Sequence, residues 1–158
     1  MEYIQLKPSS VKRFGIRTAD GIDTGEYIEI DIEDLEMPKK ADICNKKHLE
    51  NVRELNNQRL IINKKQDHKG KDELYSDNEK ALIDAVQEFY KKEEEALDEF
   101  LGKGATRKLL AGRKPYVSMY DDINEYIEQI VPVLKESQQN LIERIKSKYS
   151  KEEEDNTI

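Results

Sequence analysis

The chain has 158 residues, of which 36% are hydrophobic and 39% charged, and its formal net charge is −7. This length indicates one domain, or one domain with an appendage, and the low apolar content predicts a thin core with wide solvated helix faces. The acidic balance argues against a nucleic-acid binder, and no apolar run reaches the roughly 18 residues of a membrane span. The single Cys44 allows no internal disulfide and fits a reducing compartment.

The first 34 residues are predicted to form a β-hairpin. In the stretch GEYIEIDIED, Ile28, Ile30 and Ile32 alternate with acidic residues, which places the isoleucines on one face of a strand. RFGIRT is the candidate partner strand, and the Asp-Gly pair at 20–21 is a strong turn signal. A lone hairpin is marginally stable in water, so we expect this one to pack on a helix or to join another sheet.

Residues 35–149 are predicted to form a helical domain, because their apolar residues recur at helical spacing. Pro38 suits the start of the first helix, whereas residues 64–75 lack this spacing and indicate an exposed loop or a frayed helix end. In the last helix Pro132 predicts a kink or a fresh start. The charged end, 150–158, is predicted to be disordered. The fold class is therefore mainly α with a small N-terminal β-hairpin, at the margin of α+β.

The second predicted helix has clear end signals. Ser76 and Glu79 have the spacing of a capping box, and Gly102 suits the helix stop. Its apolar stripe is interrupted by Glu93, which belongs to a run of three glutamates. The apolar residues of this stripe are Leu82, Val86, Phe89, Leu97, Phe100 and Leu101.

The segment FLGKGATRKLLAGRKPY, residues 100–116 and here called the basic corner, holds five basic residues and no acidic one. A phosphate-binding loop is not indicated, because its glycines follow a helix and no Lys-Ser or Lys-Thr has the required spacing. The simplest interpretation is a structural corner whose cations complement the negative end of the preceding helix. The alternative is a partner-binding corner. Its candidate residues are Arg107, Lys108 and Arg113 as cations, with Tyr116, Met119 and Tyr120 as contact residues.

No catalytic, cofactor-binding or metal site is predicted. His48 and His68 do not have the spacing of a metal-ligand set and are interpreted as surface residues. The carboxylates lie in runs that indicate solvated faces, and Cys44 has only an amphipathic helix around it. We therefore expect no enzyme activity and no cofactor.

The order of elements resembles that of tail assembly chaperones of long-tailed phages and prophages of Gram-positive bacteria. The similarity is close from about Leu97 to Leu134 and holds in outline elsewhere, and the basic segment 39–71 departs from it. Four elements carry it: a helix ending at Leu97–Gly102, a small basic helix at Ala105–Leu110, Gly112-Arg113, and an aromatic and acidic helix from Tyr120 to Pro132.

This resemblance implies a non-enzymatic adaptor that coats the tape-measure protein and recruits tail tube subunits. It further implies action in the bacterial host cytoplasm and absence from the mature virion. In many relatives a programmed frameshift adds an extension, which here would follow Tyr149. The N-terminus shows no signal-peptide pattern, which is consistent with a cytoplasmic protein. The alternative hypothesis is a self-associating helical structural or regulatory protein, a homo-oligomer joined through the apolar stripe of residues 123–149.

Overall fold

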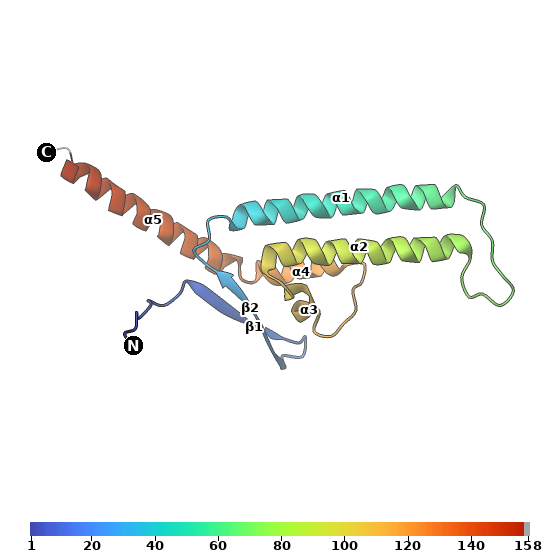
Figure 1. Cartoon of the computed structure of the whole chain (residues 1–158), viewed down its shortest axis with the longest axis horizontal. Helices are drawn as coiled ribbons and strands as arrows, with labels where there is room; N and C mark the ends of the chain where they lie inside the picture. The colour runs from blue at the N-terminus through green and yellow to red at the C-terminus, as the bar shows by residue number, and fades with distance from the viewer. Residues whose placement is uncertain (157–158) are drawn as a thin grey trace. The chain divides into compact units, whose positions relative to one another are not determined.

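The computed structural model describes residues 1–156, with side chains up to residue 150, and this part contains two strands and five helices (Figure 1). The predicted fold class, mainly α with a small N-terminal hairpin, is confirmed. Contacts divide the chain into two units: Met37–Tyr120, and Met1–Glu36 together with the chain from Asp121 onward. This division differs from the predicted boundaries at 34 and 149. Local sequence patterns do not reveal that the two ends of the chain contact each other.

The hairpin consists of β1 (Val11–Arg17) and β2 (Asp23–Asp31), which pair in antiparallel register. The predicted alternation is present, because Ile28 and Ile30 are buried while Glu29 between them is exposed. The turn follows the predicted Asp-Gly signal, and Gly21 has a φ of +82°, a conformation that glycine adopts without steric cost.

The same unit contains most of α4 (Met119–Glu128) and all of α5 (Val131–Asn156). Pro132 is the second residue of α5, so the helix begins afresh there, where a missing N–H costs little. Two contacts join α5 to the end of the hairpin: Gln138 Nε2 donates to the Asp34 carbonyl at 3.0 Å, and Arg144 pairs with Glu33.

α5 continues to Asn156, although the sequence predicts disorder from residue 150. Lys and Glu are good helix formers, so a charged segment can prolong a helix that has already formed. The rest of the predicted disordered tail, residues 157–158 and every side chain after Ser150, lies outside the described residues.

The other unit is a helical hairpin of α1 (Met37–Asn63) and α2 (Asp77–Leu101), followed by the short α3 (Ala105–Leu110). α1 and α2 lie side by side along most of their length (Figure 1). The predicted capping box is present, since Ser76 Oγ accepts from Glu79 N at 3.2 Å and Glu79 Oε1 accepts from Ser76 N at 3.1 Å. The buried apolar residues of this unit include Cys44, Ile62, Ala96, Leu97, Leu101 and Leu110.

Candidate functional site

A buried polar cluster lies between α1 and α2. Glu93 of α2 is only 1% exposed, and its Oε2 lies 2.6 Å from His48 Nδ1 of α1. The other carboxylate oxygen, Oε1, accepts from Asn51 Nδ2 at 3.0 Å. A buried carboxylate without partners would be strongly unfavourable, so these two contacts explain how Glu93 is accommodated in the core.

His48 extends the cluster to a third element. Its ring stacks on Tyr120 at the start of α4, with ring centroids 3.6 Å apart and planes within 2°. The prediction that His48 is a surface residue is therefore wrong, because the imidazole lies between a carboxylate and an aromatic ring. The interpretation of Glu93 as part of a solvated run is wrong for the same reason. The sequence signal for the burial of Glu93 is its helical spacing. Glu93 lies four residues from both Phe89 and Leu97, which places it on the same face of α2 as these apolar residues.

Cys44 lies one helical turn before His48 and is also buried. Burial and the nearby charge of Glu93 raise the pKa of its thiol to about 11. A thiol with this pKa is almost fully protonated near neutral pH and is a poor nucleophile. The cluster thus brings together a thiol, an imidazole and a carboxylate, but it favours the unreactive form of the thiol.

The basic corner is organised by Asp98, which sequence reasoning missed. Its carboxylate accepts from the backbone N–H of Gly104 at 3.1 Å and of Thr106 at 2.9 Å, and its carbonyl accepts from Gly102 N at 2.8 Å. Gly102 and Gly104 have φ values of +110° and +79°, which L side chains rarely adopt. These contacts fix the first turn of α3 against the end of α2, as the structural interpretation of this segment expects.

The predicted partner-binding residues are not equally accessible. Arg107 makes a bidentate pair with Glu94, at 2.7 Å from Nε and 3.0 Å from Nη2, and this carboxylate raises the pKa of the guanidinium. The Arg113 guanidinium lies 4.1 Å from the centroid of the Tyr116 ring. Both cations therefore already have a partner, which lies on α2 for Arg107 and within the corner itself for Arg113, while Lys108 on α3 is half-buried.

Met119 and Tyr120, predicted as contact residues, are buried at 1% and 8% exposure. They lie in the first turn of α4 and contribute to the core, so their assignment as contact residues is wrong. Apolar residues at the start of a helix, such as Met119 and Tyr120, can face either the core or the solvent, and the packing against other elements decides between the two. Val117, two residues before Met119, is 84% exposed and takes their place as an apolar contact candidate.

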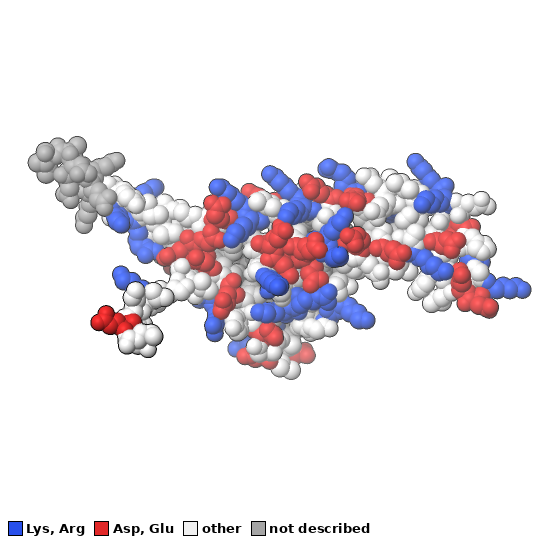
Figure 2. All heavy atoms as spheres, viewed as in Figure 1, with Lys and Arg blue, Asp and Glu red and all other residues white. Residues whose placement is uncertain are grey.

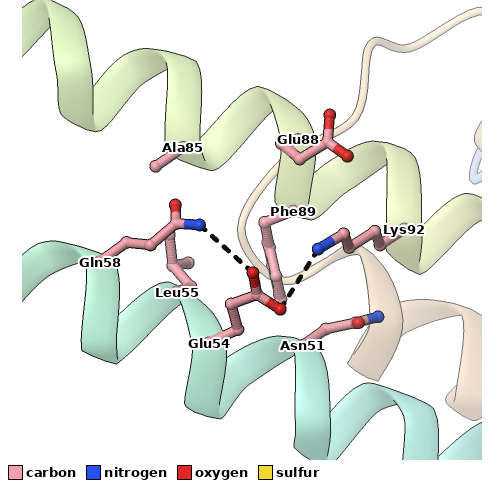
Figure 3. A pocket seen from close by; sticks show the side chains of 8 residues that line it. All are labelled: Asn51, Glu54, Leu55, Gln58, Ala85, Glu88, Phe89 and Lys92. Carbon is pink, nitrogen blue, oxygen red and sulfur yellow. Dashed lines mark hydrogen bonds and ion pairs between the residues drawn. The ribbon is translucent and has the colours of Figure 1, made fainter.

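The hollow between α1 and α2 does not form a ligand site (Figure 3). Glu54 lines it, accepting from Gln58 Nε2 at 3.4 Å and pairing with Lys92 at 3.3 Å, and Leu55 and Phe89 contribute apolar side chains to its lining. The remaining space holds no more than about one water molecule. On the face of the molecule seen in Figure 2, acidic and basic side chains are interspersed over α1 and α2.

Within residues 1–156, no group of three or more His, Cys, Asp and Glu side chains is arranged to hold a metal ion. The helices described also include none that is both long enough and apolar enough to cross a membrane. In comparisons with known proteins, no protein-family model, no curated protein and no solved structure matches this chain at a significant level.

Proposed function

We propose that this chain is a non-enzymatic assembly chaperone that covers an apolar helical partner. This is the role implied by its resemblance to phage tail assembly chaperones, with the tape-measure protein as the partner and the tail tube protein as the recruited subunit. Action in the bacterial host cytoplasm, before the virion is complete, belongs to the same proposal. A long apolar-rich helical protein aggregates when it is unshielded, and an acidic protein with spare apolar surface can shield it.

The observation that carries this proposal is an apolar stripe on α5 that remains exposed. Ile142, Ile145 and Tyr149 recur at three- and four-residue steps, so they share one face of the helix, and they are 39–55% exposed. An amphipathic helix with such a face can pack against a second helix through these anchors. The chain around the stripe is strongly charged, which favours a complex that stays in solution.

The exposed part of the basic corner is a second candidate contact in this proposal. Lys103 and Lys114 are exposed cations in the 102–119 segment, which has no acidic residue, and Val117 of the same segment is an exposed apolar side chain. Arg113 and Tyr116 present a stacked pair at the same loop. Together they suit an acidic partner surface, and this contact adds to the stripe rather than replacing it.

The test is co-expression of this chain with the helical, apolar-rich protein encoded next to it, followed by pull-down on this chain. We expect the partner to be insoluble alone and to become soluble and stoichiometrically bound with this chain. The variant Ile142→Asp/Ile145→Asp should reduce capture by roughly tenfold or more, since it places two charges on the stripe.

A matched control is Asn140→Asp/Ser147→Asp, which adds the same two charges on the opposite face of α5 and should bind as the unaltered chain does. Absence of any co-purified helical partner would refute the chaperone proposal. Equal loss of capture in both variants would refute the role of the stripe, because the effect would then follow charge alone.

The same stripe supports the second candidate function, a self-associating helical structural or regulatory protein. In that case α5 packs on α5 of another copy, and the mass of the purified chain rises with concentration without any other protein. Light scattering distinguishes the two: oligomers that vanish in Ile142→Asp/Ile145→Asp, together with failure of the co-expression test, would favour self-association as the function.

A further inference from the structure

The hairpin presents two strand edges that pair with nothing in residues 1–156. Its sheet has only two strands, so β1 and β2 each have one outer edge. Ile32 N donates to the Ser10 carbonyl at 3.3 Å, which makes that opposed pair a hydrogen-bonded one. By the alternation of an antiparallel ladder, Arg13 of β1 and Glu29 of β2 form a non-hydrogen-bonded pair and direct their backbone N–H and C=O groups outward.

The two edges carry opposite charge. β1 contains Lys12, Arg13 and Arg17 and no acidic residue. β2 contains acidic residues and no basic one: Asp23, Glu26, Glu29 and Asp31. All these charged side chains are exposed. Unpaired strand edges are ready templates for pairing with another chain, and proteins usually discourage such pairing with charges of one sign. Here β1 is basic and β2 is acidic, so the charges disfavour pairing of like strands and favour pairing of β1 with β2.

We propose that copies of this chain join edge to edge, β1 of one copy against β2 of the next, in one continuous antiparallel sheet. Pairing of β1 with β1 would place arginines near arginines, and pairing of β2 with β2 would place carboxylates near carboxylates. Only the mixed pairing sets Arg13 and Arg17 opposite acidic side chains, and opposite charges across neighbouring strands stabilise a sheet. The inference does not depend on the partner of the proposed chaperone.

Within one hairpin, Arg13 already pairs with Glu29 at 2.9 Å, on the face opposite Ile28 and Ile30. A second copy would extend this pair into a row of alternating charges across the sheet. The contact uses a different patch on each copy, so it is heterologous, and repetition gives a ring or an open filament. Its small area and exposed charges make it weak and sensitive to salt, because the Debye length falls to about 3 Å at 1 M.

The test is sedimentation velocity of the full chain over a concentration series at roughly 50 mM and 500 mM salt. We expect the mass to rise with concentration at low salt and the rise to diminish at high salt. Arg13→Glu and Glu29→Arg should each weaken association roughly tenfold, since each turns attractive pairs into repulsive ones. Arg53→Glu, the same charge change on exposed α1, is the matched control and should associate as the unaltered chain does.

Mixing the two variants distinguishes edge pairing from damage to the hairpin. Arg13→Glu makes β1 of one copy complementary to β2 of the Glu29→Arg copy, so an equimolar mixture should associate although neither variant does alone. A chain that stays monomeric at low salt would overturn the proposal. So would variants that both lose association and do not recover it on mixing, or an association that only Ile142→Asp/Ile145→Asp removes.

Discussion

Replacing Glu93 with alanine tests whether the buried polar cluster holds α1 against α2. The change removes the carboxylate that bonds His48 at 2.6 Å and Asn51 at 3.0 Å. It leaves two polar side chains of α1 without their acceptor and a small cavity where the carboxylate was. Water cannot simply replace the carboxylate, because the site is almost closed: Glu93 is 1% exposed.

The expected cost follows from these contacts. A buried polar group that loses its partner costs about 1–3 kcal/mol, and breaking a buried ionic or hydrogen-bonded pair costs about 3–5 kcal/mol. Both His48 and Asn51 retain some access to solvent, so the lower end applies. We expect Glu93→Ala to reduce the free energy of unfolding by about 3 kcal/mol. For a chain of this size that lowers Tm by roughly 6–12 °C.

The assay is urea unfolding followed by circular dichroism, with thermal unfolding as a second measure. Glu95, two residues along the same acidic run, is exposed, so Glu95→Ala should change the free energy by less than about 0.5 kcal/mol. Glu93→Gln keeps an oxygen for Asn51 and should cost about 1 kcal/mol. Equal, small effects of the alanine changes at 93 and 95 would refute the reasoning, because position 93 would then behave as a solvated site.

Three further predictions concern Cys44 and Asp98. With a pKa of about 11 instead of 9.0, the Cys44 thiol should react with iodoacetamide at pH 8 roughly a hundredfold more slowly in the folded chain than in urea; equal rates would contradict its burial. Because the pKa of Cys44 is higher in the folded state, the stabilisation that it gives is complete below about pH 9 and is lost as pH rises to about 11. The free energy of unfolding should therefore fall less between pH 9 and pH 11 in Cys44→Ala than in the unaltered chain. Asp98→Ala removes the acceptor of two N–H groups at the start of α3 and should cost about 1–2 kcal/mol with faster amide exchange in α3. Asp98→Asn keeps one acceptor oxygen for one of the two N–H groups and loses the other bond, so its effect should lie between those of the unaltered chain and the alanine variant. Unchanged exchange in the alanine variant would show that Asp98 does not fix this turn.

The features that the sequence predicts correctly are those set by neighbouring residues. The Asp-Gly turn, the alternating isoleucines of β2, the Ser76–Glu79 capping box and the stop at Gly102 each depend on a few adjacent positions. Such signals act through local backbone preference and one or two hydrogen bonds, so no knowledge of distant elements is needed.

The candidate site depends on distant pairs and was therefore missed. Glu93 resembles its neighbours Glu94 and Glu95 in the sequence, and only the packing of α2 on α1 makes one of the three buried. Its partner His48 is 45 residues away. A polar residue within each of two apolar helix stripes indicates a buried polar pair, because the two residues can form a hydrogen bond when the stripes pack against each other.

The division of the chain into two units has a consequence for the order in which it folds. The helical unit, Met37–Tyr120, is continuous, so it can form while the rest of the chain is still being synthesised. The hairpin is synthesised before the helical unit, but the bonds from its end to Gln138 and Arg144 require α5, which is synthesised after that unit. At ordinary rates of translation that wait is on the order of ten seconds. During it the bonds between the end of the hairpin and α5 cannot form, and the hairpin is available to chaperones or to neighbouring nascent chains.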